Sequence, residues 1–126
     1  MAQRKEQFWL NRRIRISAES RIQPLRWRPP TDIYRTRYGW LVKFELAGVE
    51  EEAVQLLLRG RWLRLSGSRA DLECGEGAAP HALEITYSRF ERAVELPTEA
   101  EGARLKTEYR RGMFLVHIIT RGSSHE

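Results

Sequence analysis

The chain has 126 residues, 41% of them hydrophobic and 31% charged, which is an ordinary balance for a single globular domain. No apolar run reaches the roughly 18–20 residues that span a bilayer, and the N-terminus lacks the apolar stretch of a signal peptide. The one cysteine, Cys74, cannot form an internal disulfide or a thiolate metal cage, so we expect a cytoplasmic protein.

The net charge of +5 is unevenly distributed along the chain. Residues 1–30 hold eight Arg or Lys against two Glu (+6), whereas residues 31–126 hold 14 basic and 15 acidic residues (−1). We therefore predict a basic, partly disordered N-terminal arm over residues 1–30, closed by Arg28-Pro29-Pro30, because prolines fix φ and remove a donor. Such an arm can attract nucleic acid or acidic surfaces, but we favour a solvated, flexible extension.

The chain after the arm is predicted to be all-β. Trp40, Val42, Phe44 and Leu46 alternate with polar or outward residues, as a half-buried strand requires. Glu50–Glu52 could start a helical turn. Strands are predicted over residues 32–36, 40–46, 54–58, 62–66, 83–87, 90–96, 105–109 and 113–119. Short strands with regular turns predict an immunoglobulin-like antiparallel β-sandwich over residues 31–120, followed by a short polar tail, residues 121–126.

A loop rich in glycine and alanine interrupts this strand pattern at residues 67–82. It cannot pack a core of its own, and a loop of this length inside a compact domain calls for a functional explanation.

Five segments occur in the order and at the spacing of a known family. They are Pro30-Thr31-Asp32-Ile33-Tyr34, Phe44-Glu45-Leu46-Ala47-Gly48-Val49 (with Ala47 where the family usually has proline), Leu63-Arg64-Leu65-Ser66-Gly67-Ser68-Arg69, Phe90-Glu91-Arg92 with Leu96-Pro97, and Gly112-Met113-Phe114. Over residues 28–120 the chain resembles the small heat-shock proteins of the bacterial and plant type. The resemblance implies an α-crystallin domain and an ATP-independent holdase chaperone of the stress response, which binds unfolded or partly folded clients and needs no cofactor or metal.

The resemblance also implies a dimer. In the family the long loop carries a strand that pairs with the partner subunit's sheet, and here residues 67–87 would have that role, with residues 83–87 as the exchanged strand. Such an exchange satisfies edge donors and acceptors across a two-fold axis. The predicted interface residues are Leu83, Glu84, Ile85, Tyr87 and Arg92, and Arg92 could pair with Glu84 across the dimer. The alternative is a loop that folds on its own domain.

A second expected contact is a groove. The family usually carries a C-terminal I-x-I or I-x-V that docks between two strands of a neighbour. Residues 121–126 hold no such motif, so we expect a small oligomer or hetero-oligomer rather than a large assembly. The sequence Ile14-Arg15-Ile16 in the arm could replace it, because residues i and i+2 of an extended segment point the same way. The groove would be lined by Val54, Leu56, Leu58, Leu105 and Thr107. A chance occurrence of I-x-I is an equal alternative.

Client binding is expected on apolar residues of the arm that charged neighbours keep in solution. These residues are Phe8, Trp9, Leu10, Ile14 and Ile16. Packing of Phe8 and Trp9 on their own sandwich is the other interpretation.

An enzyme is the class that the sequence disfavours most. His81, His117 and His125 are scattered without metal-ligand spacing, and no nucleophile elbow or phosphate-binding loop is present. The alternative is a non-enzymatic binding module, either a co-chaperone-like sandwich or a nucleic-acid contact through Trp9 and Trp27 among the arginines of the arm. We regard nucleic acid as the less favoured partner.

Overall fold

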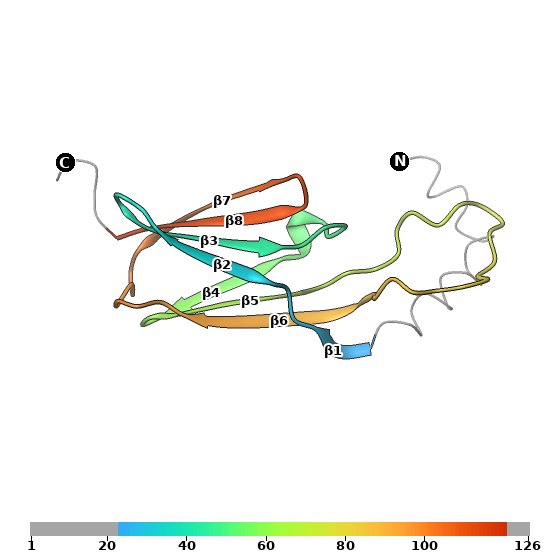
Figure 1. The fold of residues 1–126 in the computed structure, drawn as a ribbon, viewed down its shortest axis with the longest axis horizontal. Helices are drawn as coiled ribbons and strands as arrows, with labels where there is room; N and C mark the ends of the chain where they lie inside the picture. The colour runs from blue at the N-terminus through green and yellow to red at the C-terminus, as the bar shows by residue number, and fades with distance from the viewer. Residues whose placement is uncertain (1–22, 121–126) are drawn as a thin grey trace.

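Two four-stranded sheets pack face to face (Figure 1). The structure, a computed structural model, describes residues 23–120. One sheet has the order β1-β6-β5-β4 and the other β2-β3-β8-β7. The strands are β1 (Gln23–Trp27), β2 (Thr31–Arg35), β3 (Gly39–Glu45), β4 (Gln55–Arg59), β5 (Trp62–Ser68), β6 (Ser88–Glu95), β7 (Arg104–Arg110) and β8 (Met113–Ile119). The predicted β-sandwich is confirmed, and the helical turn expected at Glu50–Glu52 is the 3₁₀ turn η1 (Glu51–Ala53).

The core lies between the two sheets and is built by strand alternation. Trp40, Val42 and Phe44 on β3 point inward, as their spacing predicted, and Leu63 and Leu65 do the same from β5. The other buried apolar side chains of the core are Leu46, Val49, Phe90, Val94, Leu96, Ala100, Phe114, Val116 and Ile118. The sheets therefore join through one continuous apolar layer.

The sandwich begins earlier in the chain than we predicted. β1 lies within the stretch assigned to the arm and pairs in parallel with β6, where Gln23 lies opposite Ser88. The indole of Trp27 packs edge-on against the ring of Phe90, with centroids 5.4 Å apart. Pro29 is buried and its carbonyl oxygen accepts a bond from Arg92 Nη1 at 2.8 Å. Pro29-Pro30 therefore marks the crossing from one sheet to the other. The contact of Trp27 with Phe90 holds β1 in the sandwich, although the residues on either side of Trp27 are arginines.

The predicted strand over residues 83–87 does not form within a single chain. The chain leaves β5, runs outward as a long loop (yellow in Figure 1) and enters a strand again only at Ser88. The pairing of β5 with β6 extends only to Ser68 and Arg89, and residues 83–87 lie beyond it. Pairing with a second subunit stays a prediction.

Candidate protein-binding surface

The base of the long loop is closed by Arg69. Its Nε and Nη2 both donate to the Thr86 carbonyl oxygen, at 3.0 and 2.7 Å, and its Nη1 donates to the Ala47 carbonyl oxygen at 3.0 Å. Its guanidinium also lies over the Trp27 ring, 3.9 Å from the centroid. The backbone N–H of Arg69 donates to the Ser88 carbonyl at 2.9 Å. One side chain therefore connects the end of β5, the end of the loop, the turn after β3, and β1.

We expect Arg69→Met to loosen the loop base. The variant loses three charge-assisted hydrogen bonds and the stacking on Trp27, and hydrogen bonds to charged groups contribute about 1.5–3 kcal/mol where they are shielded from water. Arg69 is partly exposed, so we expect the smaller end of that range, which is roughly a tenfold rise in amide exchange over residues 70–87. Hydrogen exchange read by mass spectrometry measures it.

Arg59→Met is the matched control for this prediction. Arg59 is an exposed arginine on β4 and lies outside the loop base. An equal rise in exchange in both variants, or no rise with Arg69→Met, would contradict the role of Arg69.

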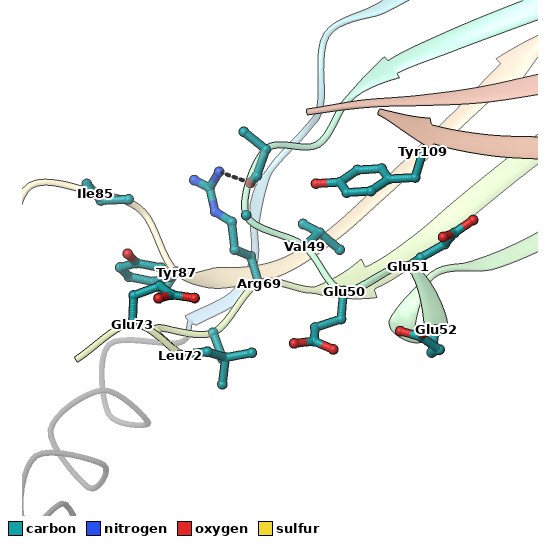
Figure 2. A pocket seen from close by; sticks show the side chains of 13 residues that line it. Val49, Glu50, Glu51, Glu52, Arg69, Leu72, Glu73, Ile85, Tyr87 and Tyr109 are labelled. Atoms are coloured by element: carbon teal, nitrogen blue, oxygen red, sulfur yellow. Dashed lines mark hydrogen bonds between the residues drawn. The ribbon is translucent and has the colours of Figure 1, made fainter. Parts of the chain in front are cut away.

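A hollow of about 630 Å³ lies beside the loop base, and we call it the loop hollow. Figure 2 shows Glu50, Glu51 and Glu52 along one side, with Ile85 and Tyr87 on the other and Arg69 between them. Its remaining lining residues are Ala47, Gly48, Val49, Ala70, Leu72, Glu73 and Tyr109. The hollow therefore combines apolar walls with an acidic rim, which suits a segment that is both apolar and basic.

The predicted interface residues gather at the same end of the sandwich. Leu83 and Ile85 are 49% and 60% exposed, and Glu84 is exposed as well. Tyr87 is half-buried under the guanidinium of Arg69, 5.8 Å from the ring centroid. Arg92 lies on the core-facing side of β6, where Nη1 donates to the Pro29 carbonyl and Nε is buried without a hydrogen-bond partner. Its pairing with Glu84 across a dimer stays a prediction.

Four of the five predicted groove residues lie on two end strands, and Val54 immediately precedes one of them. Val54, together with Leu56 and Leu58 on β4, is half-buried and packs against the core, whereas Leu105 and Thr107 are exposed on β7.

β4 and β7 follow the same side of the sandwich. At one end the Ala100 N–H donates to the Gly60 carbonyl at 3.0 Å, joining the residue after β4 to the segment before β7. At the other end Glu51, before β4, and Tyr109, on β7, line the loop hollow. The segments at both ends of β4 and β7 therefore approach each other, and we call this the β4–β7 side. A groove between the two strands stays a prediction.

The arm residues predicted to bind clients, Phe8, Trp9, Leu10, Ile14 and Ile16, lie outside the described residues. Sequence reasoning did not find Arg69 as the residue that closes the loop. The available signal was its place at the end of the segment 63–69, which resembles a segment of the family. Its partners, however, are backbone carbonyls 17 and 22 residues away, and no residue type marks a carbonyl acceptor.

Three observations bear on other function classes. Within residues 23–120 no group of three or more His, Cys, Asp or Glu is placed to hold a metal ion. His117, one of the scattered histidines, is half-buried on β8, and its Nε2 lies 3.7 Å from Glu108 Oε2. No helix in this described part is long and apolar enough to cross a membrane.

The match to known proteins covers most of the chain. The model of the Hsp20/alpha crystallin family matches residues 32–126. The chain belongs to this family. The α-crystallin domain expected from five short segments is thereby confirmed.

Solved small heat-shock protein structures share the fold. The structure is similar to HSP18.5 from E. histolytica, with a TM-score of 0.66 and 25% identity over 79% of this chain and 94% of that chain. Heat shock protein 16.0 from Schizosaccharomyces pombe also has a TM-score of 0.66, with 21% identity over 75% of this chain and 87% of that one. At 21% identity, the similarity to heat shock protein 16.0 is evidence for the fold alone.

Two curated relatives are longer than the matched region. Spore protein SP21 from Stigmatella aurantiaca is 25% identical over 93 residues, 74% of this chain and 55% of that protein. Small heat shock protein C2 from Rickettsia felis is 22% identical over 90 residues, 71% of this chain and 58% of its own length. The chain therefore spans little more than half the length of these relatives. Membership of the small heat-shock protein family supports a chaperone role and is consistent with a homo-oligomer.

Proposed function

We propose that this chain is an ATP-independent holdase that binds non-native proteins and prevents their aggregation. The observation that carries the proposal is apolar surface of an α-crystallin domain that stays exposed outside the exchanged segment. Leu57, Trp62 and Leu72 are 43–48% exposed. Non-native clients offer apolar segments, and burial of these contributes about 25 cal/mol per Å² without nucleotide hydrolysis. We place this activity in the cytoplasm.

The proposed working unit is a homodimer formed by exchange of residues 83–87. β2 is an end strand of its sheet, and Ile33 and Tyr34, on its two faces, are 39% and 46% exposed. An end strand with exposed apolar side chains favours the addition of a further strand. The segment 83–87 carries exposed apolar residues on a long tether and does not adopt strand structure in the described chain. These two complementary surfaces support its pairing with β2 of a partner subunit.

The arm is proposed to contribute in two ways. Its apolar residues bind clients, and Ile14 and Ile16 occupy the β4–β7 side. Val54, Leu56 and Leu58 are half-buried there, so two branched side chains in an extended segment could complete their burial.

Replacing Ile14 and Ile16 with serine tests this second role. Each lost apolar contact of a fully buried isoleucine would remove about 1.5–3 kcal/mol, so we expect a severalfold rise in binding of a dye that reports exposed apolar surface, together with a smaller assembly. Ile14→Val/Ile16→Val keeps two branched apolar side chains and should behave as the parent. If the serine variant has unchanged mass and dye binding, the arm does not occupy this side.

The holdase proposal itself is tested by aggregation of a heat- or reductant-denatured client. Light scattering is followed without ATP at increasing ratios of chain to client, and the mass of the assembly is measured on the same sample. Suppression at near-stoichiometric ratios is expected, and an unrelated basic protein of similar mass serves as the control. No suppression at any temperature where the chain stays folded would favour a binding module for specific folded partners.

A further inference from the structure

A second hollow, of about 320 Å³, lies where the β2–β3 hairpin meets the segment after β6 and the end of β8. We call it the hairpin hollow. Two of its described lining residues, Arg35 and Arg37, are arginines, and none carries a carboxylate. Hydroxyl groups come from Thr36, Tyr38, Thr98 and Thr120. Its character is therefore opposite to that of the acidic loop hollow.

Trp40 holds two of the donors of this hollow in place. The indole is 92% buried, and the guanidinium of Arg35 lies over its ring at 5.3 Å from the centroid. Its Nε1 donates to Thr98 Oγ1 at 3.1 Å. A hydroxyl that accepts a bond keeps its own hydrogen for another acceptor, so the Thr98 O–H can donate into the hollow. One buried ring thus orients a cation through its face and a hydroxyl through its edge.

Arg35 is suited to bind an anion. A guanidinium held over an aromatic face keeps N–H groups for a planar or tetrahedral oxyanion, which arginine binds with two parallel hydrogen bonds. Among the described residues no carboxylate forms an ion pair with Arg35. The nearest acidic neighbour in sequence to Thr98 is Glu99, whose Oε2 accepts a bond from the Glu101 N–H at 3.2 Å. That carboxylate therefore already has a backbone donor of its own.

We propose that the hairpin hollow binds a phosphate group through Arg35 and Thr98. The Arg35 guanidinium can bind two oxygens of the phosphate with parallel hydrogen bonds, and hydroxyl donors match its remaining oxygens. The phosphate can be inorganic or can belong to a nucleotide, since the chemistry of recognition is shared. This site is separate from the chaperone surface and does not depend on holdase activity.

The test uses the full chain with inorganic phosphate as the probe, followed by line broadening of its phosphorus resonance at constant ionic strength. Arg35→Gln removes a charged hydrogen-bond donor, so we expect about tenfold weaker binding. Thr98→Val keeps the shape of the side chain and should weaken binding severalfold by removing the hydroxyl donor. Arg59→Gln, on the opposite sheet, has the same loss of charge and should bind as the parent.

Three results would overturn the site. These are no broadening up to tens of millimolar phosphate, equal weakening by Arg35→Gln and Arg59→Gln, or equal competition by chloride at the same ionic strength. Circular dichroism first checks that each variant is folded, and Thr98→Val keeps the test available if Arg35→Gln is not. Competition by tripolyphosphate and by ATP then separates the sources. Equal potency means that the phosphates alone are bound, and greater potency of ATP means that the ligand is a nucleotide.

Discussion

Replacing Leu83 and Ile85 with serine should shift the assembly toward single chains. Both side chains are exposed in one chain, and the proposed exchange would bury them against the β2 edge of a partner. Burial of two such side chains contributes about 3 kcal/mol or more, which corresponds to at least a hundredfold change in the dissociation constant of each contact. Analytical ultracentrifugation over a range of concentrations measures this change.

The matched control removes apolar surface from another face. Leu57 and Trp62 lie on β4 and β5 and are 47% and 48% exposed. Leu57→Ser/Trp62→Ser should leave the dissociation constant unchanged. If this control dissociates the assembly and Leu83→Ser/Ile85→Ser does not, the interface lies on the outer face of the β1-β6-β5-β4 sheet and the exchange is wrong.

Phe90→Ala should cause a loss of stability as large as any single truncation in this core. The ring is 1% exposed and contacts Trp27 edge-on. It also covers Gly67 so closely that a Cβ at that position would lie 2.7 Å from Phe90 Cζ. Phe90 therefore joins β1, β5 and β6, and its removal leaves a cavity between three strands. Truncations of this kind cost about 3–5 kcal/mol.

Urea unfolding at a fixed chain concentration measures the effect. We expect a lower midpoint with an unchanged slope, because the surface exposed on unfolding stays nearly the same. Phe90→Leu retains most of the apolar volume and should cost less than the alanine variant. A loss below 1 kcal/mol for Phe90→Ala would mean that Trp27 and β1 do not rely on this ring.

The long loop shows how far local sequence could predict the candidate site. Glycine and alanine over residues 75–79 indicated a loop, and the loop is present. The strand predicted over residues 83–87 fails within one chain, because alternation specifies which face a residue prefers and not which strand will supply its hydrogen bonds. The prediction of an exchanged strand needs a second chain, so it is tested in solution by the first experiment above.

The basic arm shows a second limit. Charge and two prolines suggested a boundary near Pro30, and the structure instead begins its first strand at Gln23. Composition averages over a window, whereas burial depends on single side chains. Trp27 packs against Phe90 on β6 and lies beneath the guanidinium of Arg69. Neither contact leaves a periodic signal in the sequence.

The sequence by itself determined the class of fold, because a period of two is a local property of each strand. Trp40, Val42 and Phe44 had to face a core together, and Leu63 and Leu65 had to face it from another strand. The family segments at their spacing added the α-crystallin domain. Only the tertiary structure decided what lies next to what across the sheets. It brought Arg69 to the Thr86 carbonyl, Ala100 to the Gly60 carbonyl, and Thr98 to the indole of Trp40. Such contacts join residues 17 to 58 positions apart through backbone carbonyls and hydroxyls, whose partners are set by the path of the chain and not by residue type.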